Sequence, residues 1–377
     1  MKIVYCLNSI QVFGGISTAV ITKANALAEK GHEVFIAVSD HNPAIPVDVS
    51  DKVLVKDLEV KYYEDDWKSK IHVLKGILIK RRKHKKRLTQ FLNQVDPDIV
   101  ISVGQCEKYF LPRIKGRWKS IREFHYDKMY RLRGSNSFPQ KLLAYIINIY
   151  DYKFKIKLYD QIVILTEDDK NVNWKNNSKV TVISNPIAKL ANKESLLEKK
   201  KIVTAGHLIK VKNHSSLINV FCLVIKKHPE WELDIYGDGE LKEQLTKEIY
   251  KNGLTNHVFL KGYKPHLQEV LNGYSIFVLS SIYEGMPMVI LEAMSCGLPV
   301  ISYDCPYGPK QLIKDGENGY LVPVNDEAMM ARKICDLIEN DDKRKEMGKK
   351  ALLSAEPFRC EIIHSKWIAL FENLLHT

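Results

Sequence analysis

The sequence predicts an α/β protein with two domains, each built on a parallel β-sheet. The chain has 377 residues, of which 45% are hydrophobic, so at roughly 150 residues per domain it can bury two cores. Short apolar runs rich in β-formers alternate with helical segments, as in parallel sheets. The polar stretch 188–201 lacks an apolar period and divides this alternation into two series.

The first series begins with a clear strand–helix–strand unit. Residues 2–8 are typical of a buried strand, Gly14 and Gly15 predict a turn, and a helix over 16–30 is closed by Gly31. The strands expected next cover 34–39, 99–103 and 161–165. The segment VTVISNP, 180–186, ends a further strand in a turn.

The second series follows the polar stretch. Its expected strands cover 201–205, 231–236, 257–260, 276–280 and 299–303. We expect an N-terminal domain over 1–185 and a C-terminal domain over 201–357, joined by a linker over 186–200. A C-terminal segment over 358–377 follows the second domain. Ligands of open parallel sheets bind beyond the carboxyl ends of the strands, so we expect a cleft where two such edges face one another.

The cysteines favour a reducing compartment. They number seven and form no C-x-x-C pair, so the sequence indicates neither a disulfide framework nor a zinc knuckle. The first residues lack the apolar core and cleavage site of a signal peptide, and no apolar run approaches the ~20 residues of a membrane span. We therefore expect a cytoplasmic protein.

The net charge of +12 indicates an anionic partner. Residues 67–87 contain no carboxylate, and Ile71, Leu74 and Leu78 recur there at helical spacing. The cations proposed to form a membrane or acceptor surface are Arg81, Arg82, Lys85 and Lys86. The segment is either a helix lying on anionic lipid or a solvated basic helix whose apolar stripe belongs to the core. Nucleic acid is disfavoured as a partner, because no nucleic-acid-binding module accompanies the charge.

The most informative segment is 280–304. A strand ends there, a loop carries Glu284 and Gly285, Pro287 opens a helix that bears Glu292, and Gly297 closes it. A helix N-terminus offers unpaired amides and a positive dipole end to diphosphate or sugar oxygens. On spacing alone, Glu284 could instead simply complement the helix dipole.

This segment resembles the signature of family 4 of the nucleotide-sugar glycosyltransferases, E-G-x-P-x-x-x-x-E-A-M-A-x-G-x-P-V. The matching residues are Glu284, Gly285, Pro287, Glu292, Ala293, Met294, Gly297, Pro299 and Val300. The resemblance implies the GT-B fold, with two Rossmann-like domains facing across a cleft, and a retaining transfer from a nucleotide diphosphate sugar. It implies that Glu284 orients the sugar and Glu292 the ribose. The implied donor-binding loop also includes Gly285, Met286, Pro287 and Met288.

A second match covers AGHLIKVKNH, 205–214, which resembles the family's G-R-L-x-x-x-K-G segment. Lys212 fills the lysine position, and the resemblance implies that it neutralises donor phosphates. His207 stands where arginine is usual, and Asn213 replaces the glycine. Histidine is mostly neutral near pH 7 and lacks the bidentate fork of arginine, so Lys212 would carry most of the charge. Without the resemblance, Lys212 would be interpreted as a surface lysine.

The N-terminal half adds weaker matches. Gly14 and Gly15 resemble the glycine pair whose amides approach the donor diphosphate, and His125 resembles a histidine that many members point at the donor sugar. A lone histidine is otherwise more often a satisfied core residue. The C-terminal segment 360–375 is expected to be helical and, by resemblance, to cross back to the first domain.

The segment 304–323 resembles a family subset that assembles surface polysaccharides and glycans, although Gln311 replaces the usual glutamate. The resemblance implies transfer that needs neither a cofactor nor a divalent metal, from UDP-sugar, the commonest donor, to a lipid-linked or glycan acceptor at the inner membrane face. The acidic clusters 64–66 and 167–169 are interpreted as solvated loops or helix caps rather than metal sites. Two alternatives remain: a nucleotide-sugar epimerase or hydrolase, and a catalytically silent nucleotide-binding partner.

Overall fold

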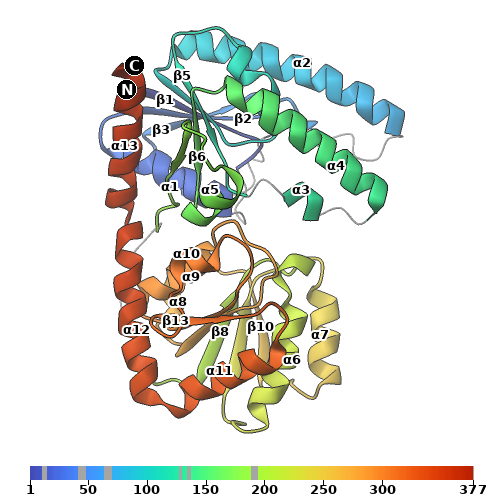
Figure 1. Ribbon diagram of the computed structural model, residues 1–377, viewed down its shortest axis with the longest axis vertical. Helices are drawn as coiled ribbons and strands as arrows, with labels where there is room; N and C mark the ends of the chain where they lie inside the picture. Colours follow the sequence, from blue (N-terminus) through green and yellow to red (C-terminus); the bar gives the residue numbers. More distant parts are fainter. Residues whose placement is uncertain are drawn as a thin grey trace. The chain divides into compact units, whose positions relative to one another are not determined.

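The computed structural model describes residues 1–10, 15–40, 48–62, 70–126, 130–133, 137–187 and 194–376. The chain divides into two compact units, each with its own parallel sheet (Figure 1). The N-terminal unit comprises Met1–Ala188 and Cys360–Thr377, and the C-terminal unit comprises Lys189–Arg359. Two Rossmann-like sheets in one chain are the GT-B architecture that the resemblance implied, and the fold prediction is confirmed.

The sheet of the N-terminal unit has the strand order β3-β2-β1-β4-β5-β6-β7, with every described pair parallel. Its strands are β1 (Lys2–Leu7), β2 (Glu33–Val38), β3 (Val53–Asp57), β4 (Ile99–Ser102), β5 (Lys119–Glu123), β6 (Gln161–Ile164) and β7 (Val180–Val182). The central strands are buried on both faces and consist mostly of β-branched and aliphatic residues, as expected of a parallel sheet covered by helices.

Helices cover the two faces of this sheet. Ile3 and Tyr5 of β1 share a core with α1 (Gly15–Glu29) and α13 (Cys360–His376), whereas Val4 and Cys6 share one with α2 (Lys70–Val95). This division follows from the alternation of side chains along a strand. The remaining helices of the unit are α3 (Tyr130–Arg133), α4 (Phe138–Tyr150) and α5 (Glu167–Asn173), with short turns η2 (Glu107–Tyr109), η3 (Leu111–Arg113), η4 (Asp151–Lys155) and η5 (Ile156–Leu158).

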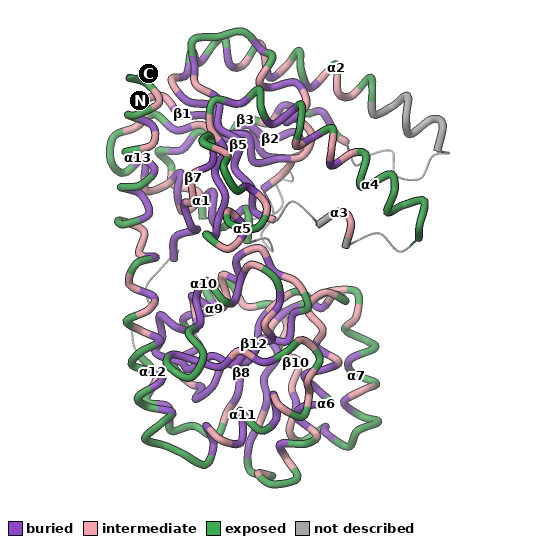
Figure 2. Tube along the Cα trace, in the orientation of Figure 1, coloured by how far each residue is buried: buried purple, intermediate pink, exposed green. Residues whose placement is uncertain are grey.

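The sheet of the C-terminal unit has the order β10-β9-β8-β11-β12-β13, again parallel. Its strands are β8 (Lys201–Ala205), β9 (Glu232–Tyr236), β10 (Val258–Gly262), β11 (Ile276–Leu279), β12 (Val300–Tyr303) and β13 (Gly319–Val322). Its helices are α6 (His214–Ile225), α7 (Lys242–Lys251), α8 (Gln268–Leu271), α9 (Met288–Ser295), α10 (Pro309–Leu312), α11 (Glu327–Glu339) and α12 (Asp341–Ala355), with turns η6 (Lys210–Lys212) and η7 (Glu356–Phe358). Buried residues follow the strands, and exposed ones follow the outer sides of the helices (Figure 2).

The expected strands differ from the observed ones by a residue or two at their ends, and β8 covers the expected residues 201–205. The sequence predicted neither β3 nor β13, and it assigned no bounds to β5. In β3 only Val53 is buried, because the strand lies at the sheet edge, so its sequence lacks a continuous apolar run. The expected C-terminal helix is α13. It packs on α1 in the N-terminal unit, where the imidazole Nε2 of His364 lies 3.2 Å from the carbonyl oxygen of Lys23.

Candidate active site

Two loops of the C-terminal unit lie side by side at the carboxyl edge of its sheet. The turn η6 follows β8, and the loop that leads into α9 follows the neighbouring strand β11. Backbone and side-chain hydrogen bonds join them: the amide of Ile282 donates to the carbonyl of Val211 (3.0 Å), and the Ser280 hydroxyl donates to the carbonyl of Lys212 (2.9 Å). The fold thereby brings residues more than seventy positions apart in sequence to one place.

Lys212 and Glu284 form an ion pair across these loops. The Lys212 Nζ donates to Glu284 Oε1 at 2.6 Å, and the Ser281 hydroxyl donates to the same oxygen at 2.6 Å. The side chain of Glu284 is 9% exposed and that of Lys212 is 19% exposed. Glu284 is thus a partly desolvated carboxylate held by two donors, and Lys212 retains ammonium protons that can bind a further anion.

The loop before α10 packs against Glu284 from another side. A Cβ atom added to Gly308 would lie 2.6 Å from Cδ of Pro287 and 3.0 Å from Cβ of Glu284. The buried thiol of Cys305 lies in the same environment: burial first, and then the charge of Glu284, raise its pKa to about 12. The segment from 304 to 309 therefore determines how closely this loop approaches the carboxylate.

The two departures from the lysine-containing motif have different structural consequences. Asn213 adopts φ 54° and ψ 40°, the left-handed conformation, and caps α6. Asparagine is, after glycine, a residue that tolerates this conformation, so its presence in place of glycine preserves the turn. His207 lies after β8 and is exposed. Its imidazole cannot form the two parallel hydrogen bonds that an arginine guanidinium donates to a phosphate.

Glu292 is the fifth residue of α9, little more than one turn after the loop that carries Glu284. Burial raises the pKa of its carboxyl to about 7, and a hydrogen bond with Gln268 opposes that rise. Of the other predicted donor-binding residues, Met286 is buried, Pro287 caps α9, and Met288 is its first residue. The structure therefore gathers the predicted residues of the C-terminal motif around the entrance of one helix.

In the N-terminal unit, His125 follows β5 and is buried. Its Nε2 lies 3.0 Å from Glu123 Oε1, and its Nδ1 lies 3.5 Å from Nδ2 of Asn185. Glu123 also pairs with the buried ammonium of Lys23. Burial alone would raise the pKa of Glu123, but Lys23 and then His125 lower it to about 2. Burial lowers the pKa of His125.

The interactions of Lys23 were not predicted from the sequence. Lys23 lies on α1, one hundred residues from Glu123, and its ammonium also lies 4.8 Å from the centre of the Trp367 ring of α13. No sequence signal distinguishes it from the surface lysines of a helix. His125 therefore belongs to a buried charged cluster, and its role toward a donor sugar stays a prediction. Gly15 is the first residue of α1, and Gly14 lies outside the described residues.

The acidic cluster Glu167, Asp168 and Asp169 forms the first turn of α5, where Asp169 binds Asn173 and Trp174 and its amide donates to the cap residue Thr166. The cluster 64–66 lies outside the described residues. Within the described ranges, no three His, Cys, Asp or Glu side chains are arranged to hold a metal ion.

The basic segment forms α2, whose buried side carries His84, Leu88 and Leu92. Arg82, Lys85 and Lys86 are exposed, and the Arg81 guanidinium lies 4.5 Å from the centre of the Tyr109 ring. Leu78 is 59% exposed and is not part of the core, whereas the side chains of Ile71 and Leu74 lie outside the described residues. None of the described helices has the length and apolarity needed to cross a membrane.

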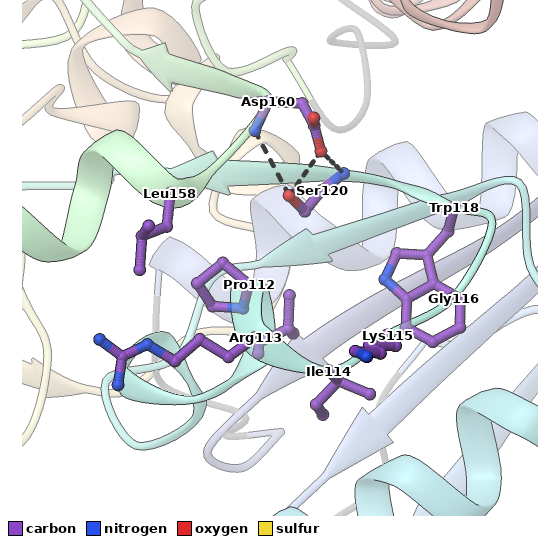
Figure 3. A pocket seen from close by; sticks show the side chains of 10 residues that line it. Pro112, Arg113, Ile114, Lys115, Gly116, Trp118, Ser120, Leu158 and Asp160 are labelled. Carbon is purple, nitrogen blue, oxygen red and sulfur yellow. Dashed lines mark hydrogen bonds between the residues drawn. The ribbon is translucent and has the colours of Figure 1, made fainter.

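A cavity of about 440 Å³ lies elsewhere in the N-terminal unit (Figure 3). It is lined by the segment before β5 and by Leu158 and Asp160, just before β6. Asp160 is already engaged there, since its Oδ2 accepts hydrogen bonds from the amide and hydroxyl of Ser120, both at 2.7 Å. The cavity is at the amino ends of the strands, the edge opposite to the one where ligands of open parallel sheets bind.

Comparisons with known proteins identify the family of this chain. Residues 13–188 match the model of Glycosyltransferase Family 4, and residues 187–353 match that of Glycosyl transferases group 1. An uncharacterized glycosyltransferase of Haemophilus influenzae is 29% identical over 97% of this chain and 98% of its own. An uncharacterized glycosyltransferase of Methanocaldococcus jannaschii, MJ1059, is 31% identical over 63% of this chain and 70% of its own.

A poly(ribitol-phosphate) α-N-acetylglucosaminyltransferase of Staphylococcus aureus is 35% identical over 56% of this chain, which spans 44% of that enzyme. Among solved structures, S. aureus TarM in complex with UDP and α-GlcNAc-glycerol has a TM-score of 0.77 at 18% identity, covering 98% of this chain and 99% of its own. The pneumococcal O-GlcNAc transferase GtfA in complex with UDP and GlcNAc has a TM-score of 0.77 at 17% identity. The match covers 100% of this chain and 99% of GtfA. The two family models, which together span residues 13–353, and the relative MJ1059 show that this chain belongs to glycosyltransferase family 4.

Proposed function

We propose that the protein transfers a sugar from a UDP-sugar to a lipid-linked or glycan acceptor, with retention of anomeric configuration and without a divalent metal at the donor. The observation that carries this proposal is the Lys212–Glu284 pair at the entrance of α9. An ammonium beside a helix N-terminus suits a departing diphosphate, and a fixed carboxylate suits sugar hydroxyls. Solved structures of the same fold that contain UDP support the choice of nucleotide.

Each residue has a distinct role in this mechanism. Lys212 and the amides at the start of α9 stabilise negative charge on the leaving diphosphate. Glu284, oriented by Lys212 and Ser281, accepts hydrogen bonds from the sugar, and Glu292 accepts them from the ribose. Neither glutamate acts as a covalent nucleophile, and the leaving phosphate helps remove the acceptor proton on the face from which it departs.

The proposed acceptor and location follow from the charge of α2. Its exposed cations, Arg82, Lys85 and Lys86, attract an anionic surface at the inner face of the plasma membrane, where a lipid-linked acceptor is presented. Similarity to a poly(ribitol-phosphate) glycosyltransferase over part of the chain supports an anionic glycan as the other acceptor class. The proposal therefore concerns cell-surface glycan assembly.

The test is a screen of purified protein against nucleotide sugars, with water-soluble glycan and lipid-linked acceptors, in which nucleotide release and product are both measured. Transfer from UDP-sugar that persists in excess EDTA, with retained configuration by NMR, supports the proposal. Donor consumption without acceptor product would identify an epimerase or hydrolase. UDP binding without turnover would identify a silent partner, and activity abolished by EDTA and restored by Mn²⁺ would contradict the metal-free mechanism.

A further inference from the structure

The side of α4 that faces solvent is apolar. Helices on the surface of a globular protein normally direct polar residues outward. Here Phe138 is 80% exposed, Leu142 51%, and Ile146 54%. The other exposed apolar or aromatic residues of this surface are Leu143, Tyr145, Tyr150, Phe154 and Leu158, and we call the whole set the α4 apolar surface.

Four residues of this surface form one continuous face of α4. At roughly 100° per residue, Phe138, Leu142, Tyr145 and Ile146 fall within about a third of the circumference. The residues that α4 buries, Ala144 and Asn148, lie outside this arc. The helix therefore attaches to the unit by a narrow side with small and polar residues and leaves its apolar side uncovered among the described residues.

The charges near this surface indicate what binds it. Between Ser137 and Leu158 the single carboxylate is Asp151, which is buried and paired with Lys108 and Arg131. The lysines of the segment, in contrast, include the exposed Lys141, Lys153 and Lys157. The nearest exposed carboxylate is Asp160, beyond Leu158, and it accepts hydrogen bonds from Ser120. Apolar and aromatic residues flanked by lysines are the composition of helices that lie in the interface of an anionic bilayer.

The basic helix α2 is connected to the same part of the unit. Arg81 of α2 stacks on Tyr109, the ammonium of Lys108 lies 4.9 Å from the centre of the same ring, and Lys108 pairs with Asp151 at the end of α4. Figure 1 shows α2 and α4 extending on the same side of the sheet. The contacts of Arg81, Tyr109, Lys108 and Asp151 therefore link α2 to the C-terminal end of α4 within the same unit.

We infer that the α4 apolar surface inserts into the lipid interface of an anionic membrane, while α2 supplies the electrostatic attraction. This deepens the membrane location in the proposed function. The two contributions have different physical signatures. Attraction between exposed charges and anionic lipid is screened by salt, whereas burial of apolar side chains among acyl chains is not.

The experiment compares three proteins by flotation with vesicles of phosphatidylcholine, with and without 30% phosphatidylglycerol, in 0.1 M and 0.5 M NaCl. The α4 variant carries Phe138→Gln, Leu142→Gln and Ile146→Gln. The control variant carries Val172→Gln, Tyr250→Gln and Leu353→Gln, which remove apolar side chains of comparable exposure from other helices. Unfolding curves establish that both variants are folded.

Wild type and control should bind the anionic vesicles, and part of this binding should persist in 0.5 M NaCl. The α4 variant should bind at least about tenfold more weakly and lose the salt-resistant part. As a second readout, Phe138→Trp should show blue-shifted fluorescence that spin-labelled lipid quenches, and Tyr250→Trp should not. Equal binding of the α4 and control variants, or no quenching at position 138, would overturn the inference.

Protein partners are separate outcomes of the same experiment. A concentration-dependent dimer of the wild type, abolished in the α4 variant and accompanied by no vesicle binding, would show that a second copy covers α4 and would overturn the lipid inference. Transfer to a water-soluble acceptor is measured in parallel. Since α4 contributes no donor-site residue, the α4 variant should retain that activity. Failure of lipid insertion is thereby distinguished from failure of the transferase proposal.

Discussion

Lys212 and Glu284, seventy-two residues apart, form a 2.6 Å ion pair that joins the loops after two adjacent strands. The contact connects the two motifs that the sequence provides separately, one with a lysine after β8 and one with a glutamate before α9. A partly buried pair of this kind favours one orientation of each side chain. In the proposed mechanism the ammonium binds phosphate and the carboxylate binds the sugar.

Replacement of Lys212 by alanine should weaken UDP binding. Loss of a charged hydrogen bond corresponds to about 1.5–3 kcal/mol, or roughly ten- to hundredfold in Kd by calorimetry. Lys210→Ala is the matched control, because Lys210 is an exposed lysine of the same turn. Lys212→Arg should restore part of the affinity. If the alanine variants at 210 and 212 bind UDP equally, Lys212 does not contact the phosphates.

The raised pKa of Glu292 predicts a pH dependence of stability. The carboxyl has a pKa of about 7 in the folded state, above its usual value, so the folded protein favours the protonated form. Its contribution to stability is full at low pH and is lost as pH rises through about 7. Glu292→Gln, which is neutral throughout, should be more stable than wild type by about 1–3 kcal/mol at pH 8 and little changed at pH 4.5. Urea unfolding at the two pH values measures this difference, and a gain that does not grow with pH would contradict it.

The same group predicts a pH dependence of donor use. If the ionised form of Glu292 binds the ribose, the KM for the donor should rise as pH falls through about 7. Glu292→Gln should have a high KM with a flat profile over this range. Steady-state kinetics at constant ionic strength, with a soluble acceptor, provide the measurement. A wild-type profile that is flat from pH 6 to 8 would exclude a role for the carboxylate charge.

The left-handed conformation of Asn213 predicts a difference between two small substitutions. Asn213→Gly should be close to wild type in stability, whereas Asn213→Ala should cost about 1–2 kcal/mol, because alanine tolerates the left-handed conformation at φ 54° less well than glycine or asparagine. Urea unfolding compares the two variants. Equal stability of the glycine and alanine variants would show that the turn relaxes to another conformation.

The buried pair of Lys23 and Glu123 predicts non-additive effects on stability. Glu123→Gln leaves the buried Lys23 ammonium without its carboxylate, and Lys23→Met leaves Glu123 with His125 beside it but without the ammonium, each at a cost of about 3–5 kcal/mol. The double variant removes both charges and should cost less than the sum of the single variants. A double-mutant cycle measures the coupling energy, and additive losses would indicate that the two groups do not stabilise each other.

The sequence predicted most of the fold because the central strands carry continuous apolar runs and the helices between them end at recognisable residues, such as Gly31 and Gly297. It did not predict β3, an edge strand with a single buried residue, since little of its sequence reflects burial. The exposed apolar side of α4 was missed for a related reason. An apolar period predicts that a helix has an apolar face, but it does not show whether that face is buried in the protein or exposed to solvent.

The site was predicted unevenly. Glu284, Glu292 and Lys212 belong to motifs with fixed spacing, and Asn213 shows why one departure from a motif is structurally neutral. The surroundings of His125 depend on Lys23 and Glu123, whose contact spans one hundred residues. Such a contact is created by the order of the strands and helices, and no local pattern encodes it.

The most direct test of the account compares wild type with Glu284→Gln, which keeps the size of the side chain and removes its charge. UDP affinity by calorimetry and sugar transfer to a soluble acceptor are measured on the same preparations. The account predicts UDP affinity within about threefold of wild type, because the nucleotide lacks the sugar that Glu284 binds, and transfer reduced by at least about a hundredfold. Unchanged transfer by Glu284→Gln would contradict the assignment of this carboxylate to the donor sugar.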